Sequence, residues 1–190
     1  MERERIGFMG VLPYRNVMPR LAEDVFVAPG AWVIGNVEIA ARSSVWFNTV
    51  IRGDVHTIRI GSETNIQDNC SLHVTEPDFP LEIGNRVTVG HRAIVHGCVV
   101  EDDCLIGMGV IILDGAKIGR GSVIAAGALI TPGFVVPPKS LVMGSPAQVK
   151  RPITDEEFQR AQKSYFHYID LASDYRDPGR EGIRIKGFLG

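Results

Sequence analysis

A six-residue spacing of aliphatic residues runs through most of this chain. The residues stand six positions apart in four unbroken series: Val27 to Ile51, Ile60 to Leu72, Ile83 to Val95 and Val100 to Val136. An α-helix would instead show spacings of three and four. A period of six is typical of short parallel strands wound around a prism, with about 18 residues in each three-stranded turn. We therefore expect an all-β solenoid, a parallel β-helix.

Three breaks in the spacing show where the coil gains or loses residues. Ile51 and Ile60 are nine apart, an insertion of three, and Leu72 and Ile83 are eleven apart, an insertion of five. From Val95 to Val100 the spacing is five, a deletion of one. Once these breaks are removed, residues that stack one turn apart can be identified.

Three polar residues then fall in one column on one wall of the prism. His73 follows Leu72 and His96 follows Val95, so both side chains point outward when their neighbours point inward. They are 23 residues apart, which becomes 18 without the insertion, and the same correction aligns Arg52 with His73. The spacing predicts a stacked column of Arg52, His73 and His96.

His91 follows a glycine at a corner and is expected to point toward another edge. Zinc–nitrogen bonds are about 2.0–2.1 Å long, so two stacked imidazoles can share an ion that His91 cannot reach within the same chain. We therefore expect a homotrimer with three interfacial sites, each using His73 and His96 of one subunit and His91 of its neighbour. Three imidazoles leave a fourth position open, as in catalytic zinc sites. For His56 and His167, outside this register, a surface or structural role is expected.

Three segments resemble the gamma-class carbonic anhydrase family, especially its bacterial branch. They are Ile51-Arg-Gly-Asp54, Asn65-Ile-Gln-Asp-Asn-Cys-Ser-Leu-His73 and Gly90-His-Arg-Ala-Ile-Val-His-Gly97, and the resemblance covers roughly residues 8–175. It implies a left-handed β-helix, a trimer, and a metal ion between subunits. Zn²⁺ is the expected ion, and Fe²⁺ or Co²⁺ are alternatives.

The resemblance also implies roles for residues around the histidines. Arg52 and Asp54 match the interface ion pair of the family, a geometry in which a bidentate guanidinium is useful. Asn65, Gln67 and Asp68 match positions that support the ligands and orient the substrate. Asn65 and Asp68 could instead serve turns between strands, where such residues are favoured.

The expected activity is reversible hydration of carbon dioxide to bicarbonate by a metal-bound hydroxide, the reaction of a carbonic anhydrase lyase. The hydroxide must be regenerated by proton transfer, and here the chain departs from the best-studied family members. Their glutamate after the Arg-x-Asp motif is replaced by Val55, which His56 follows. A second glutamate is matched by Glu76, in the predicted loop Val74–Glu82, although Glu76 could equally be an ordinary loop acid. The loss of this carboxylate therefore bears on the rate of turnover and leaves the predicted metal site intact.

The same sequence features are compatible with two other functions. A hexapeptide acyltransferase would use the same coil and trimer with one catalytic histidine and acyl-coenzyme A; the segment Gly144-Ser-Pro-Ala147 occurs in both groups and does not discriminate. A metal-binding trimer with weak catalysis would act as a scaffold or assembly subunit, which Val55 favours. Three histidines at metal-ligand spacing favour the carbonic anhydrase.

Composition limits the partners and the compartment. The 190 residues carry a net charge of −2 without a basic cluster, which argues against nucleic acid and an anionic membrane surface. The segment Met1–Arg5 lacks the apolar region of a signal peptide, and no apolar run approaches the roughly 18 residues of a membrane span, so we expect a cytoplasmic protein. Cys70 and Cys104 take small inward positions, as expected of reduced core thiols.

The C-terminal part is expected to leave the coil. We place the β-helix in residues 1–150, a helix in 151–177 and a loosely held tail in 178–190. Thr154 and Glu157 form a predicted capping box at the start of an amphipathic helix that should pack along the prism. Tyr165 and Tyr168 could approach the metal from this helix, but a packing role is favoured.

Overall fold

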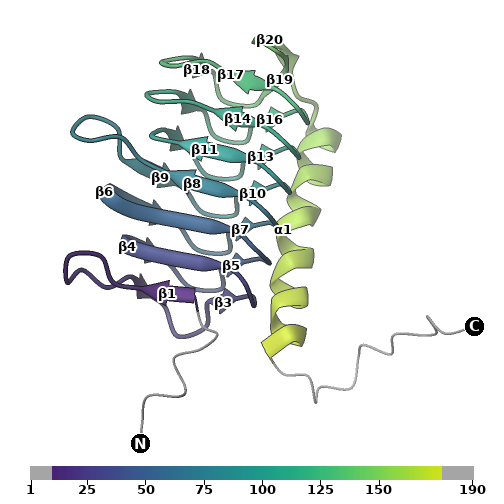
Figure 1. The fold of residues 1–190 in the computed structure, drawn as a ribbon. Coiled ribbons are helices and arrows are strands. Elements are labelled where there is room, and N and C mark those ends of the chain that lie inside the picture. Colours follow the sequence, from purple (N-terminus) through teal and green to yellow (C-terminus); the bar gives the residue numbers. More distant parts are fainter. Residues whose placement is uncertain (1–9, 177–190) are drawn as a thin grey trace, which may run out of the picture.

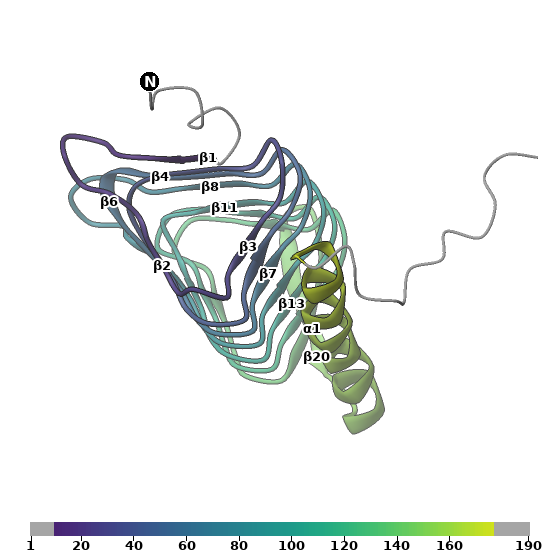
Figure 2. The ribbon, with the colours of Figure 1, turned by 90° about the horizontal axis from the view of Figure 1, so that it is seen from below.

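The computed structural model describes residues 10–176 as a parallel β-helix with one α-helix along its side (Figure 1). Seen from the N-terminal end, the coil has a triangular outline and runs anticlockwise as it recedes, which makes it left-handed (Figure 2). The fold expected from the six-residue repeat and from the family resemblance is confirmed.

The strands form three walls, numbered here in the order in which the chain meets them. Two long strands, β4 and β6, begin on wall 1 and continue around a corner onto wall 2. Wall 1 consists of β1 (Gly10–Leu12), β4 (Trp32–Ile39), β6 (Val50–Ile60), β8 (Ser71–His73), β11 (Ile94–His96), β14 (Ile111–Ile112) and β17 (Leu129–Ile130). Wall 2 adds β2 (Arg20–Leu21), β9 (Leu81–Ile83), β12 (Val99–Val100), β15 (Lys117–Ile118) and β18 (Val135–Val136). Wall 3 consists of β3 (Phe26–Val27), β5 (Ser44–Val45), β7 (Asn65–Ile66), β10 (Thr88–Val89), β13 (Leu105–Ile106), β16 (Val123–Ile124) and β19 (Ser140–Gly144).

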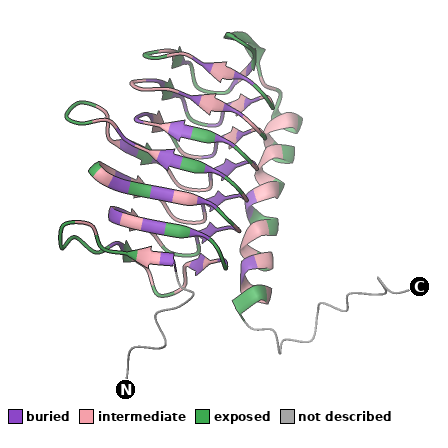
Figure 3. Ribbon diagram, viewed as in Figure 1, coloured by how far each residue is buried: buried purple, intermediate pink, exposed green. Residues whose placement is uncertain are grey.

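The aliphatic repeat forms the core because each wall stacks like residues one turn apart. On wall 1, Ile51 pairs with Leu72, Leu72 with Val95, and Val95 with Ile112, and all four are at most 1% exposed. Buried and exposed residues alternate along the strands, as one inward and one outward face requires (Figure 3). Val27 is only half-buried, since it belongs to the first wall 3 strand, at the end of the stack.

Both predicted insertions lie at the corner between wall 1 and wall 2. In the pairing of β4 with β6, Gly35 lies opposite Gly53 and Val37 opposite Ile58, so β6 carries three additional residues there. The larger insertion lies between β8 and β9 and closes with an antiparallel bridge between Thr75 and Phe79. The coil thus accommodates both insertions without losing its stacking.

The coil ends in a hairpin and not in a simple exit. After Gly144 the chain reverses, and β20 (Ala147–Pro152) pairs antiparallel with β19. Strand structure therefore extends past the expected boundary at residue 150. The antiparallel partner covers the last wall 3 strand, which would otherwise leave unpaired backbone groups at the end of the sheet.

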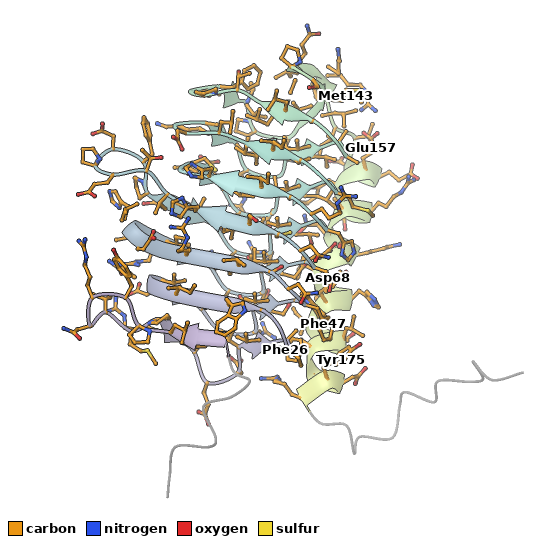
Figure 4. The ribbon with its side chains drawn as sticks, viewed as in Figure 1. Phe26, Phe47, Asp68, Met143, Glu157 and Tyr175 are labelled. Atoms are coloured by element: carbon orange, nitrogen blue, oxygen red, sulfur yellow. The ribbon has the colours of Figure 1, made fainter. Side chains whose placement is uncertain are left out.

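Helix α1 (Asp155–Arg176) follows the hairpin and runs back along wall 3. Its start is fixed by the predicted capping box: the amide of Glu157 donates to Thr154 Oγ1 at 3.2 Å, and the amide of Thr154 donates to Glu157 Oε2 at 2.9 Å. Figure 4 shows Phe26, Phe47 and Tyr175 gathered where the end of α1 meets the first turns of the coil. The tail expected in 178–190 lies outside the described residues.

Within residues 10–176, no helix has both the length and the apolar character that a membrane crossing requires.

Candidate metal centre

Strand pairing places two histidines of wall 1 directly above one another. The Cα atoms of His73 in β8 and His96 in β11 are register partners, and Arg52 follows the paired residue Ile51 on β6. The side chains of His73 and His96 are 25% and 28% exposed, so they are partly shielded from water but open on one side. The structure thus brings together the column of three polar residues that the spacing predicted.

Two ring nitrogens of this pair face each other. His73 Nδ1 and His96 Nε2 are 3.0 Å apart, with ring centroids 5.1 Å apart. Nitrogens bound to one tetrahedral zinc ion by bonds of about 2.0–2.1 Å lie about 3.3 Å from each other. The separation is therefore close to that of two ligands of a single ion.

A carboxylate contacts the other ring nitrogen of each histidine. Asp54 Oδ1 lies 3.0 Å from His73 Nε2, and Asp114 Oδ1 lies 2.6 Å from His96 Nδ1. An ionised carboxylate can only accept, so each of these nitrogens carries the proton, and the two facing nitrogens of neutral rings are left with lone pairs. Two lone pairs at this distance repel unless a proton or a cation lies between them. The donor set therefore fits a divalent cation that accepts imidazole ligands.

Asp54 is also bound by Arg52 of the same chain. Burial favours the neutral acid, but hydrogen bonds from Arg52 and His73 hold the pKa of Asp54 below its usual value. The carboxylate therefore stays ionised and can keep His73 in one orientation. The resemblance implies that the pair of Arg52 and Asp54 belongs to a subunit interface; within one chain the two side chains already contact each other.

His91 lies at a different corner, after β10. Its Nδ1 is 2.6 Å from Asp68 Oδ2, and its backbone amide donates to Gln67 Oε1 at 3.2 Å. Asp68 lies between wall 3 and α1 in Figure 4. In the described part of the chain, no three His, Cys, Asp or Glu side chains gather around one common metal position. Among residues 10–176, His73 and His96 therefore lie together, whereas His91 lies at another corner and its Nε2 has no hydrogen-bond partner.

Asn65 and Gln67 belong to a buried polar chain on wall 3. Gln67 Nε2 donates to Asn65 Oδ1 at 3.2 Å, and Asn65 Nδ2 donates to Thr88 Oγ1 at 2.9 Å. Asn65 is 1% and Gln67 is 5% exposed. This series of hydrogen bonds ends at the backbone amide of His91, which donates to Gln67 Oε1, so it fixes the backbone that carries His91.

Glu76 is exposed on the loop that follows His73, and Val55 and His56 lie in the smaller insertion beside it. Val55 is 41% exposed, since the three additional residues of β6 bend away from the core there. His56 Nε2 lies 3.0 Å from the carbonyl oxygen of Pro77, and His56 Nδ1 accepts from the amide of Thr57 at 2.7 Å. The position of the missing family glutamate thus lies next to the loop of Glu76.

The two tyrosines of α1 take part in packing. Tyr165 is buried and stacks on Phe166 with centroids 4.3 Å apart, and Tyr168 meets the edge of Trp46 at 5.1 Å. Burial, followed by the nearby charge of Asp68, raises the pKa of Tyr168. The structure shows no contact between either phenol and His73 or His96 among the described residues.

The three cysteines are free and buried, and burial raises the pKa of each thiol to about 12. They are core residues, as expected for Cys70 and Cys104.

Sequence reasoning missed Asp114, the carboxylate that contacts His96. Its signal was present, because Asp114 stands about one turn after His96, at the corner following β14. Asp114 lies in the turn after β14 and so does not belong to the outward column that the aliphatic spacing defines.

Known proteins resemble this chain over most of its length. Residues 97–132 match the model of the bacterial transferase hexapeptide (six repeats) family. The relative named "Probable carbonic anhydrase" in Methanocaldococcus jannaschii is 51% identical over 152 residues, which are 80% of this chain and 95% of the relative. The "Carbonic anhydrase" of Geobacillus kaustophilus is 43% identical over 166 residues, 87% of this chain and 91% of the relative.

Other relatives are longer or carry other names. The chain spans 57% and 64% of the length of the mitochondrial gamma carbonic anhydrases 2 and 1 of Arabidopsis thaliana, at 45% and 43% identity. A solved structure from Bacillus cereus, described provisionally as an acetyltransferase, superimposes with a TM-score of 0.87 at 42% identity and covers 88% of this chain and 97% of its own. The left-handed coil, the motifs around its histidines, the gamma carbonic anhydrases among its relatives and two carbonic anhydrases that it matches over 91–95% of their own length place this chain in the gamma carbonic anhydrase family.

Proposed function

We propose that the protein is a metal-dependent carbonic anhydrase, which hydrates carbon dioxide reversibly to bicarbonate at sites between the subunits of a homotrimer. The observation that carries the proposal is the pair of ring nitrogens of His73 and His96, 3.0 Å apart, with a carboxylate behind each ring. Family membership supports the same reaction. Zn²⁺ is the proposed ion, with Fe²⁺ and Co²⁺ as alternatives.

Three histidines would hold the ion, His73 and His96 from one subunit and His91 from the next. When bound, a divalent cation supplies Lewis-acid activation of water. Each imidazole is prepared for this role in the same way, because Asp54, Asp114 and Asp68 respectively occupy one ring nitrogen and leave the other free. His91 Nε2 is the free nitrogen that the neighbouring subunit would receive.

The exterior of wall 1 supports a trimer. Apart from Arg52 and Ser71, the outward positions of its strands above and below the histidines are mostly apolar, and a surface of this kind is expected at a protein interface. Trp32 and Ile94 are 43% and 40% exposed in one chain. Val50, Ile111 and Leu129 continue the same outward face and are half-buried. A second copy of the chain would cover this surface and bring a corner histidine to the column.

The remaining polar residues would orient the substrate and move protons. The family resemblance assigns Gln67, Asn65 and Asp68 to orientation, and the buried hydrogen-bond chain from Thr88 to His91 would keep Gln67 in one position. The Glu76 carboxylate, exposed on its loop, would take a proton from the site and release it to buffer. Without a glutamate at Val55, this route has one carboxylate fewer than in the best-studied relatives.

The test measures metal and turnover on the same purified protein. We expect hydration of carbon dioxide with bound zinc, or with iron under anaerobic conditions, and loss of both metal and activity in His96→Ala. His167→Ala is the matched control, since this exposed histidine lies on α1 and should leave metal content unchanged. Metal-loaded protein without hydration would exclude the carbonic anhydrase and favour the scaffold.

A second candidate function is acyl transfer, because the similar Bacillus cereus structure is described as an acetyltransferase. A hexapeptide acyltransferase would bind acetyl-coenzyme A in the absence of metal, and calorimetric titration of the metal-free protein with this compound distinguishes the two. We expect no binding. The cytoplasmic location and the lack of nucleic-acid and membrane partners stay predictions.

A further inference from the structure

A single carboxylate connects the loop between β8 and β9 to the ring of His96. Asp114 Oδ1 is 2.6 Å from His96 Nδ1, and Asp114 Oδ2 accepts a hydrogen bond from Thr75 Oγ1 at 3.0 Å. In residues 10–176, these are the two side chains that hydrogen-bond to Asp114, and it forms no ion pair with Lys or Arg. The orientation of the carboxylate therefore depends on the loop as well as on the histidine.

The loop itself is well fixed at its base. Thr75 and Phe79 exchange backbone hydrogen bonds of 3.1 and 3.0 Å. Phe79 lies over two glycines of the coil: a Cβ atom added at Gly97 would come within 2.8 Å of Phe79 Cβ, and one at Gly115 within 3.0 Å of its ring. The close approach of Phe79 brings the Thr75 hydroxyl within reach of Asp114.

A second contact holds the Thr75–Phe79 loop, and it comes from the three-residue insertion of β6, which includes His56. His56 Nδ1 accepts from the backbone amide of Thr57, so the ring proton lies on Nε2 and is donated to the carbonyl oxygen of Pro77 at 3.0 Å. Glu76 lies between this contact and the hydrogen bond of Thr75. A change in the orientation of the loop would thus change the position of Glu76.

We propose that Asp114 is a positioning residue that couples the Thr75–Phe79 loop to the His96 imidazole. The proposal rests on the proposed function in one respect, that His96 binds the ion. A cation that fixes the His96 ring also fixes Asp114 and, through Thr75, the loop that carries Glu76. Such coupling is reciprocal. The factor by which bound metal favours the Thr75–Asp114 hydrogen bond is also the factor by which this hydrogen bond raises the affinity for the metal.

The first measurement is the zinc affinity of the full-length protein, by competition with a chromophoric chelator. We expect Asp114→Ala to lower the affinity about 10–100-fold, the usual effect of losing a carboxylate behind a metal-ligating histidine. Thr75→Val, which replaces the hydroxyl by a methyl group of similar size, should lower the affinity severalfold, up to about tenfold. Thr75→Ser retains the hydroxyl and should restore wild-type affinity. Asp78→Asn is the control, since it removes an exposed carboxylate from the same loop without touching Asp114.

Combining two substitutions separates coupling from a general loss of structure. In the Asp114→Ala background, Thr75→Val should change zinc affinity no further, because the route from the loop to the ring is already broken. Zinc should slow amide hydrogen exchange at Thr75 and Phe79 in the wild type but not in Thr75→Val. If the two substitutions have independent, additive effects on affinity, the coupling is wrong.

A metal-free readout distinguishes failure of this proposal from failure of the metal site. The His96 Nδ1 proton resonance of selectively labelled protein reports its hydrogen bond to Asp114 without any ion. We expect Thr75→Val to shift this resonance and Asp78→Asn to leave it in place. Wild-type protein that binds no zinc, with the shift observed, overturns the metal site alone; an unchanged resonance in Thr75→Val overturns the coupling.

Discussion

His73, His91 and His96, the three proposed metal ligands, each have an aspartate at hydrogen-bonding distance. Asp54, Asp68 and Asp114 come from different parts of the coil, yet each contacts one ring nitrogen. The residue types and the stacking of His73 and His96 could be predicted, since both follow from the repeat. The ring orientations could not, because they depend on side-chain contacts across corners whose geometry the spacing does not fix.

Glu76 provides a test of proton transfer at the scale of one residue. We expect Glu76→Gln to lower the turnover of carbon dioxide hydration about tenfold or more in dilute buffer, while metal content stays unchanged, because the amide cannot carry the proton. Concentrated imidazole buffer should restore much of the loss. Stopped-flow hydration assays at two buffer concentrations check this, and an unaltered rate in dilute buffer would assign Glu76 an ordinary surface role.

The lowered pKa of Asp103 makes the free energy of unfolding depend on pH. Burial favours its neutral form, but Arg86 and Arg120 outweigh burial and hold the pKa of Asp103 below its usual value. The stabilisation is complete above about pH 5, where an unfolded aspartate is almost fully ionised, and is lost as pH falls through the lower value of the folded protein. Asp103→Asn should cost about 2 kcal/mol at pH 7 and progressively less below about pH 5.

Urea unfolding of both proteins between pH 7 and 3 measures this difference. Asn suits the site because Asp103 has a φ of 63°, a conformation that Asn tolerates. Asp170→Asn is the control, since Asp170 is exposed on α1. A cost of Asp103→Asn that stays constant down to pH 3 would contradict the assignment.

At the scale of elements, the walls and the helix follow from different features of the sequence. The walls follow from the aliphatic period, and the start of α1 follows from the capping box of Thr154 and Glu157. The hairpin of β19 and β20 was not predicted, because its strand lacks the inward period and gains its hydrogen bonds from one neighbouring edge. The contact between α1 and wall 3 required the structure as well.

Trp46 tests how α1 is attached to the coil. It is 3% exposed, packs against Phe26, Tyr168 and Tyr175, and donates from Nε1 to Ser44 Oγ at 2.9 Å. We expect Trp46→Ala to lower the free energy of unfolding by about 3–5 kcal/mol and to speed amide exchange in the C-terminal half of α1. Trp46→Phe, which retains a ring, should lose less. A loss below about 1 kcal/mol in Trp46→Ala would show that the helix is held elsewhere.

At the scale of the whole molecule, the proposed site is complete only when subunits combine. The described chain brings His73 and His96 together and leaves His91 at another corner, so the homotrimer stays a prediction that a mixing experiment can test.

Two inactive variants should restore one another. His91→Ala and His96→Ala are each expected to bind no stoichiometric zinc. Unfolded together and refolded as mixed trimers, they should regain up to about one site per trimer, where His96 of one subunit meets His91 of the other. Metal content and hydration of the mixture, compared with each variant refolded alone, check this. Absence of zinc in mixed trimers would contradict a site shared between subunits.

The sequence by itself determined the coil, its wall positions and the stacking of Arg52, His73 and His96, because a strand repeat with one inward position defines which residues share a column. Only the tertiary structure decided which nitrogens face each other, that Asp114 joins the loop to His96, and that Asn65 and Gln67 form a buried chain ending at His91. These contacts cross corners and insertions, where the backbone leaves the period, so their distances depend on how the whole coil packs.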